Sequence, residues 1–192
     1  MGCNDRLTEG MFGGCVYPPK GGIDGGKAVL INFDDIDRSA TVKNGAVISD
    51  LVLLSGKTGY VIEWYKQLGS SNSAYSPNAE DIDGFLHNFV CRLPVSDKEA
   101  AERAQELKNG RFVVVYESRY KGENNEDAFK VLGIENGMTL SEMTQNTAEN
   151  SGSLPFTLAT QEGDYEPYPY SIFLETDYAT SKATFDASFA TV

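Results

Sequence analysis

Residues 96–120 have the sequence SDKEAAERAQELKNGRFVVVYESRY, which predicts one helix followed directly by one strand. Ser96 is a good N-cap, and Glu99, three residues on, completes a capping box. Strong helix formers follow, and Asn109-Gly110 ends the helix. The apolar stripe of this helix is narrow and consists of Ala100, Ala101, Ala104 and Leu107. We therefore expect the helix to cover a sheet rather than to join a helical bundle.

Segments rich in β-branched and aromatic residues surround this unit. The predicted strands span residues 27–33, 46–55, 58–68, 85–93, 111–120, 128–134, 138–143, 154–160 and 170–176. Glu135-Asn136-Gly137 predicts a hairpin between two of them, whereas 69–84 is polar and predicts a long loop. The fold class is therefore mainly β (α+β), an antiparallel β-sandwich or barrel with one flanking α-helix.

The N-terminal segment differs from the rest in composition. Residues 1–26 are rich in Gly and Pro and show no sustained periodicity, which predicts an extended N-terminal arm. We expect residues 27–192 to form a single β-rich domain. The start, MGCNDRLTEG, has no apolar stretch typical of a secretory signal, and no run approaches the roughly 20 apolar residues of a membrane span.

The charge balance and the scarcity of catalytic groups favour a structural role. The chain carries 28 Asp and Glu against 16 Lys and Arg, a formal net charge of -12, and one histidine. No phosphate-binding loop, nucleophile elbow or paired-cysteine knuckle occurs, so neither an enzyme nor a cofactor or metal site is expected. The acidic excess argues against gripping nucleic acid, but not against DNA moving past a repulsive wall. General solubility explains the same charge.

Three sets of residues are candidate chemical sites. His87 could act as a general base, but it shares a strand face with Phe85 and Phe89, which favours a place at the edge of the core. Alternating carboxylates could chelate calcium, or could form an acidic turn at a strand end; they are Asp24, Asp34, Asp35 and Asp37. The cysteines are odd in number and predict unpaired thiols in a reducing compartment; they are Cys3, Cys15 and Cys91.

Two segments are candidate interfaces. The polar loop carries Tyr75, Asp81 and Asp83, and either meets a partner or is simply solvated. The run DYEPYPY carries Tyr165, Tyr168 and Tyr170. Tyrosine is favoured at interfaces, but a proline-stiffened turn that covers the sheet explains the run equally well.

The order of elements in the second half carries a resemblance. The helix SDKEAAERAQELKNG, the strand RFVVVYESRY, the pair FKVLGIENGMTLSEM and then NSGSLPFTLATQEGDYEPYPYSIF together resemble virion structural proteins of tailed bacteriophages. The likeness is to the tail-tube-like and tail-ring proteins of phages of gut Bacteroidota, over about residues 85–173.

The resemblance implies an assembly and a location. Subunits of that family form rings, commonly hexamers, whose sheets join into a barrel around a channel for the genome. It implies a homo-oligomer in the virion, assembled in the bacterial host cytoplasm, that contacts neighbouring tail or head-to-tail connector proteins and passes DNA without binding it specifically. An acidic lumen is then expected, with Glu63 and Glu117 as candidates on outward strand faces.

A different class of protein remains an alternative. A monomeric β-sandwich binding module, an adhesin or a carbohydrate-binding domain, would use exposed aromatic side chains as a ligand platform. Trp64 and the tyrosines of DYEPYPY are the candidates for that platform. A glycosidase needs only two carboxylates, so an acidic chain leaves an enzyme as a third possibility.

Overall fold

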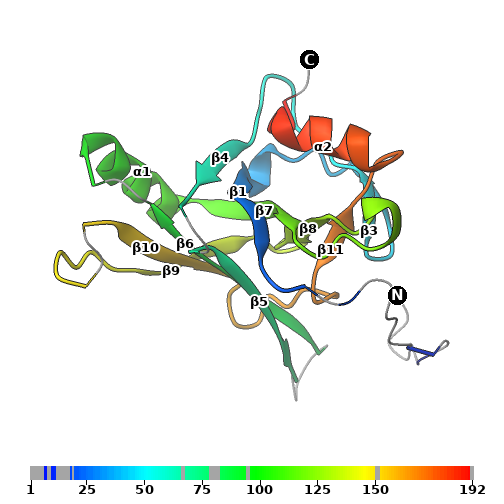
Figure 1. Ribbon diagram of the computed structural model, residues 1–192, viewed down its shortest axis with the longest axis horizontal. Helices are drawn as coiled ribbons and strands as arrows, with labels where there is room; N and C mark the ends of the chain where they lie inside the picture. The colour runs from blue at the N-terminus through cyan, green and yellow to red at the C-terminus, as the bar shows by residue number, and fades with distance from the viewer. Residues whose placement is uncertain are drawn as a thin grey trace.

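The computed structural model describes residues 7, 10, 11, 18, 20–65, 68–77, 83–93, 96–149 and 152–190. In these residues the chain forms one sheet of eleven strands and two α-helices (Figure 1). The strands are β1 (Ile23–Asn32), β2 (Val42–Asn44), β3 (Val47–Asp50), β4 (Tyr60–Glu63), β5 (Ser70–Ser76), β6 (Gly84–Leu93), β7 (Arg111–Ser118), β8 (Phe129–Leu132), β9 (Met138–Met143), β10 (Leu154–Ala159) and β11 (Ser171–Phe173). The helices are α1 (Lys98–Asn109) and α2 (Tyr178–Asp186). The prediction of a mainly β fold with a flanking helix is confirmed.

Strands β1 and β7 form the centre of the sheet. They pair antiparallel, with Ala28 opposite Tyr116 and Asn32 opposite Phe112. Their side chains are buried on both faces of the sheet, so β7 carries a continuous apolar run instead of an alternation. These two strands therefore share in two separate cores.

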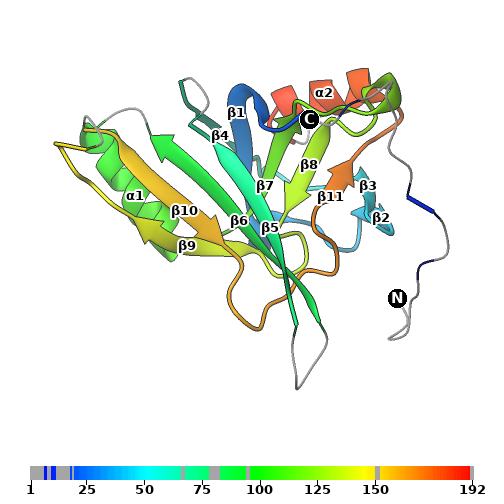
Figure 2. The ribbon, with the colours of Figure 1, turned by 60° about the horizontal axis from the view of Figure 1, so that its bottom comes forward.

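The first core lies on the face of β1 and β7 that α2 covers. Its main members are Val29, Ile31, Val113, Val115, Phe129, Phe173, Phe185 and Phe189. The second core lies between the opposite face of β1 and β7 and the strands β6 and β10, which curl over it (Figure 2). Its main members are Leu30, Trp64, Phe89, Phe112, Val114, Tyr116, Met138, Phe156 and Leu158. Each buried phenylalanine contributes about 1.5–3 kcal/mol.

The sheet divides into two wings along one edge of β7. Val114–Glu117 pair with β8, whereas Arg111 and Phe112 pair with β9, both antiparallel. Strands β8 and β9 therefore run in the same direction, and the hairpin predicted at Glu135-Asn136-Gly137 is wrong. Strands β8 and β9 lie end to end along the same edge of β7, and residues 133–137 form a turn that bulges out between them. From β8 one wing continues through β11, β3 and β2, and from β9 the other continues through β10, β6 and β5.

The turn at 133–137 is built by two glycines and one buried carboxylate. Gly133 and Gly137 have φ of 72° and 77°, a region that strongly favours glycine. The side chain of Glu166 is 1% exposed and accepts the backbone N–H groups of Glu135 and Asn136 at 2.9–3.1 Å. Burial raises the pKa of the Glu166 carboxyl, while the backbone N–H groups of the turn favour its ionised form.

His87 closes the same junction from the other side. It is 1% exposed, its Nδ1 accepts the N–H of Gly133 at 3.0 Å, and its Nε2 lies 2.8 Å from the carbonyl oxygen of Tyr168. Because Nδ1 accepts, the ring is neutral and Nε2 donates to Tyr168. Burial lowers the pKa of the His87 imidazole. The prediction of a histidine in the core, rather than a general base, fits this arrangement, since backbone groups occupy both ring nitrogens.

Helix α1 begins one residue later than predicted. Asp97, not Ser96, is its N-cap, and the Asp97 carboxylate accepts the N–H of Ala100 at 2.8 Å. Glu99 therefore stands too early to complete a capping box. Ala100 and Leu107 are buried as expected, but Ala101 is exposed, so the apolar stripe is narrower than predicted.

Three further predictions are corrected. Residues 69–84, expected to be a loop, contain β5, which pairs with β6 from Ser70↔Val90 to Ser76↔Gly84, because a strand's backbone pairs without apolar side chains. The predicted strand 46–55 pairs only over β3, which runs parallel to β11, so the sheet is mixed. The arm ends before residue 26, since Ile23 is buried at the start of β1.

The histidine gives the first testable prediction. His87 is the one histidine of the chain, and its imidazole is neutral in the folded protein. Below pH 6.5 the imidazole therefore binds a proton in the unfolded chain but not in the folded chain. The contribution of His87 to the free energy of unfolding is therefore complete above pH 6.5. It is lost as the pH falls toward the lowered pKa of His87 in the folded protein. We expect His87→Asn, which retains an acceptor for Gly133, to cost about 1–3 kcal/mol at pH 7.5.

Urea unfolding between pH 7.5 and pH 5.5 measures this effect. The wild type should lose stability as pH falls, with a slope of at most about 1.4 kcal/mol per pH unit for one proton. The raised pKa of Glu166 acts in the opposite direction in both proteins, because protonation relieves its burial. The Asn variant should therefore show a flatter or reversed slope, and equal slopes in the two proteins would contradict the account.

Candidate functional site

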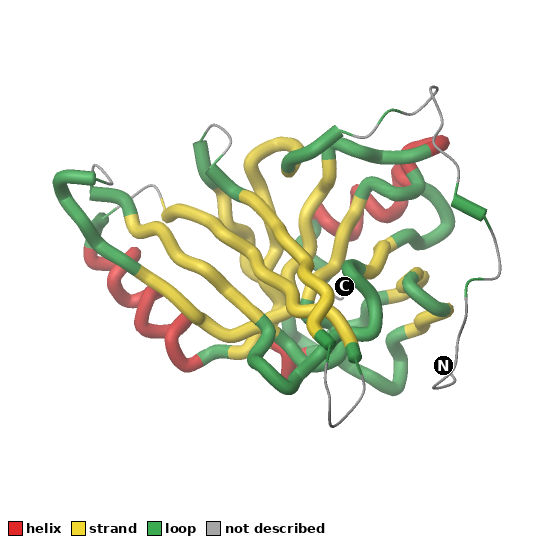
Figure 3. The backbone as a smooth tube through the Cα atoms, turned by 90° about the horizontal axis from the view of Figure 1, so that it is seen from below, coloured by secondary structure: helices red, strands yellow, loops and turns green. Residues whose placement is uncertain are grey.

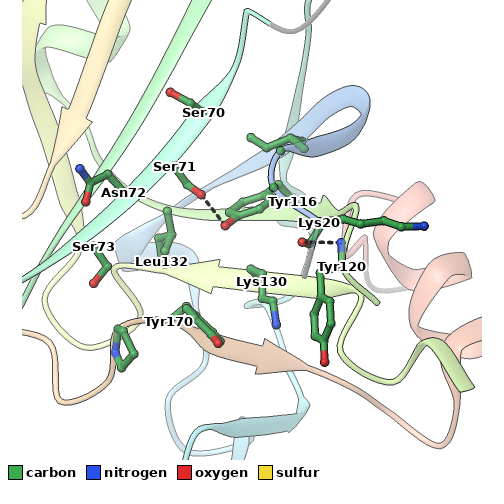
Figure 4. Close-up of a pocket in the computed structure, with 15 residues that line it drawn as sticks. Lys20, Ser70, Ser71, Asn72, Ser73, Tyr116, Tyr120, Lys130, Leu132 and Tyr170 are labelled. Atoms are coloured by element: carbon green, nitrogen blue, oxygen red, sulfur yellow. Dashed lines mark hydrogen bonds between the residues drawn. The ribbon is translucent and has the colours of Figure 1, made fainter. Parts of the chain in front are cut away.

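A cavity of about 460 Å³ opens at the end of the second core, between β5 and the strands β7 and β8 (Figure 4). The N-terminal residues 20–23 and Pro169-Tyr170 complete its wall. Its polar lining comprises Lys20, Ser70, Ser71, Asn72, Ser73, Tyr116, Ser118, Tyr120, Lys130 and Tyr170. Its volume falls within the range of about 300–1,000 Å³ that is typical of small-molecule sites.

Lys130 is the most unusual group in the wall. It lies on β8 opposite Tyr116 of β7 and is 6% exposed. Its ammonium sits over the ring of Tyr170, 4.4 Å from the centroid, and Figure 4 shows the two side chains together below β8. In the described part of the chain no carboxylate forms an ion pair with it. Burial lowers the pKa of the Lys130 amine, and the more distant Asp127 offsets this in part.

The serines of β5 face the cavity from the other side. The hydroxyls of Ser71 and Tyr116 are hydrogen-bonded at 2.5 Å across it (Figure 4). The Oγ of Ser73 is buried and has no hydrogen-bond partner among the described residues. Buried hydroxyls are nearly always bonded, so an unpartnered one in a cavity wall is a group that a ligand could satisfy.

The charge of the lining is opposite to that of the whole protein. Two lysines and no Asp or Glu line the cavity, although the chain has a net charge of -12. Hydroxyl and amide side chains make up the rest of the polar lining. The arrangement suits a small polar anion.

The predicted interface residues do not form one surface. Tyr75 donates to Asp83 at 2.7 Å, and Tyr165 packs against the adjacent Gly84. Tyr168 instead reaches the turn at Gly45. Tyr170 lies in the cavity over Lys130, and Asp81 lies outside the described residues.

The two lumen candidates differ. Glu63 is exposed on β4, as a lumenal carboxylate requires. Glu117 is buried, 8% exposed, where its carboxylate pairs with Lys121 at 2.6 Å and accepts the hydroxyl of Tyr178 at 2.7 Å. Glu117 is therefore a structural ion pair and cannot present its charge to a channel.

The acidic cluster considered for calcium is dispersed. The carboxylates of Asp24, Asp34 and Asp35 pair with Lys121, Arg111 and Lys57, and Asp37 bonds to Ser39 and to the N–H of Ala40. In the described ranges no three His, Cys, Asp or Glu residues gather as metal ligands.

Trp64 and Cys91 are both buried. Trp64 is 6% exposed and its ring meets that of Phe89 edge-on, so it is not an exposed ligand platform. Cys91 is a free, buried thiol whose pKa burial raises to about 12. Cys3 and Cys15 lie outside the described residues.

Comparisons with protein-family models, with curated protein sequences and with solved structures gave no match. No helix among the described residues is long and apolar enough to cross a membrane.

Lys130 was not among the site residues predicted from the sequence. A signal was present, because a lysine interrupts the apolar segment AFKVLGI of the predicted strand at 128–134. The charged side chain of such a residue lies either in solvent or in a buried functional site. The alternation of apolar and polar residues along the strand does not by itself distinguish the two.

The burial of Lys130 yields a stability prediction. Lys130→Met retains the aliphatic stem against Tyr170 and removes an ammonium that has no carboxylate partner. We expect this variant to be more stable than the wild type by roughly 1 kcal/mol, because the burial penalty of the ammonium disappears. Urea unfolding at pH 7 measures it. Lys108→Met on the exposed end of α1 is the matched control and should change little; a destabilised Lys130→Met would show that the ammonium is satisfied within the fold.

Proposed function

We propose that this protein is a structural subunit that assembles with copies of itself, in the form of a ring or tube of a bacteriophage tail. The observation that carries the proposal is an open, almost uncharged sheet surface on a strongly acidic protein. The element order that resembles tail-tube-like and tail-ring proteins supports the specific form of the assembly.

The open surface is the outer face of the wing formed by β9, β10, β6 and β5. Figures 2 and 3 show these strands side by side, with no described helix over that face. On β6 the outward side chains alternate with the buried His87, Phe89 and Cys91. The outward residues of β5, β6 and β10 are Ser70, Asn72, Ala74, Ser76, Leu86, Asn88, Val90, Arg92, Pro155, Thr157 and Ala159, of which only Arg92 is charged. On β9 the exposed Glu142 lies opposite Thr157 on the same face, so the charge-poor part of the surface is that of β5, β6 and β10.

The free edge of the same wing is unprotected. Strand β5 pairs with β6 alone among the described strands. Its sequence SSNSAYS has no charged residue and no proline over seven residues. Natural edge strands usually carry such features, because an unprotected edge pairs with other strands. An edge that is meant to be covered by a second copy needs none of them.

The distribution of charge favours association through this wing. Two copies at -12 each repel one another wherever their acidic surfaces meet. The outer face of β5, β6 and β10 carries no carboxylate. Contact between two copies through this face therefore avoids the unfavourable energy of placing like charges together at an interface. Sheets that join edge to edge would also produce the continuous barrel that the resemblance implies.

Glu63 is the remaining lumen candidate in this proposal. It is exposed on β4, on the side chain face opposite to Ile62 and Trp64. A ring that turned β4 toward its channel would place a carboxylate from each subunit along the DNA path. Repulsion between those carboxylates and phosphates would keep the DNA from adhering.

The alternative is a monomeric binding module. Burial of Trp64 removes its main aromatic platform, but the cavity at Lys130 gives a binding site independently of that platform. Oligomeric state separates the two functions, because a binding module needs no second copy.

A matched pair of substitutions tests the assembly. Val90 is 38% exposed on the open face, and Val42 is 52% exposed on β2 of the other wing. We expect the wild type to form discrete oligomers in sedimentation velocity and negative-stain images. Val90→Glu should raise the dissociation constant at least about tenfold, because a carboxylate would be buried in the interface. Val42→Glu should assemble as the wild type does.

Two results would contradict the proposal. A wild-type protein that remains monomeric at high concentration and ordinary salt would remove self-assembly altogether. Assembly that survives Val90→Glu but fails with Val42→Glu would place the interface on the other wing.

A further inference from the structure

We propose that the cavity between β5 and β8 binds a small polyhydroxylated carboxylate, such as a uronic acid, with the Lys130 ammonium on the carboxylate. This function goes beyond self-assembly and does not depend on it. The cavity, Lys130 and Ser73 belong to a single chain.

Lys130 has unused hydrogen-bonding capacity. Its ammonium has three N–H donors, and among the described residues its contacts are the ring of Tyr170, at 4.4 Å, and the more distant charge of Asp127. The side chain is 6% exposed and lines the cavity. Burying an ammonium away from carboxylates is unfavourable, and an anion in the cavity would reverse that cost.

The opposite wall offers hydroxyl groups. The Oγ of Ser73 is buried without a partner among the described residues, independently of Lys130. Ser71, two residues before it on the same inward face of β5, lines the cavity and shares a hydrogen bond with the hydroxyl of Tyr116. Hydroxyls both donate and accept, as the hydroxyls of a sugar require. One wall thus supplies a cation and the other supplies hydroxyl groups.

The lining also favours a carboxylate over a phosphate. The wall contains no arginine, whose planar fork is suited to phosphate, and no residue of a described helix N-terminus. Lys20 at the mouth is exposed, which leaves Lys130 as the single buried cation. A monoanion therefore balances the buried charge, whereas a phosphate dianion would not.

Isothermal titration of the Val90→Glu variant tests the proposal. This background separates ligand binding from assembly, and its open-face substitution lies outside the cavity lining. The probes are glucuronate, glucose and glucose 6-phosphate. We expect glucuronate to bind. Glucose should bind at least about tenfold more weakly, because it lacks the carboxylate that would interact with the Lys130 ammonium.

Substitutions locate the site. Adding Lys130→Met should abolish glucuronate binding, Ser73→Ala should weaken it several-fold, and Lys108→Met on exposed α1 should leave it unchanged. Binding should also weaken as pH rises and the Lys130 ammonium deprotonates, an effect that a purely structural lysine would not produce.

Each other outcome overturns the proposal. Preferential binding of glucose 6-phosphate would assign the cavity to phosphate. Equal binding of glucose and glucuronate would remove the role of Lys130. If Lys130→Met is folded, as its urea unfolding curve can verify, and still binds glucuronate, the ligand lies elsewhere. If none of the three probes binds, the cavity does not have this function.

Discussion

The carboxylate of Glu166, bonded to the backbone of the turn at 133–137, is the contact on which the arrangement of the sheet depends. At this turn the edge of β7 passes from β8 to β9, and the two wings separate. The turn lies between β8 and β9 and outside their ladders, so its backbone N–H groups need other acceptors. Glu166 supplies two oxygens to Glu135 and Asn136, and His87 accepts from Gly133. The N–H groups of the turn thereby stabilise the buried Glu166 carboxylate, and the carboxylate in turn fixes the conformation of the turn.

The division of the sheet explains why a cavity exists. Strands β6 and β10 curl over β1 and β7 and fill the second core with Phe89 and Phe156. Strand β8 belongs to the other wing, so the face that carries Lys130 and Leu132 is covered by small side chains of β5, by residues 20–23 and by Pro169-Tyr170. The space left between them is polar because β5 contributes serines there. Fold and site are thus consequences of one junction.

Local signals predicted much of this structure, and contacts remote in sequence decided the rest. Strand β9 matches its predicted bounds, and α1 is displaced by one residue, because both depend on neighbouring side chains. The hairpin at 135–137 was wrong, since a turn sequence fixes a change of direction but not the strand that receives it. Strand β5 was missed because its residues are polar and its partner β6 supplies the order. The hydrogen bond that Glu117 accepts from Tyr178 of α2 and the burial of Trp64 against Phe89 of β6 join residues remote in sequence, which no local pattern reveals.

Native-state hydrogen exchange at the junction tests this account most directly. The side chain of Glu135 is exposed, yet its N–H donates to buried Glu166, as does that of Asn136. The account predicts that these two amides and that of Gly133 exchange only through global unfolding, at the same free energy as the amide of Val114 in β7. Fast exchange at the free energy of a fraying surface turn, such as that at Gly45, would show that the wings hold together without the junction and would contradict its central role.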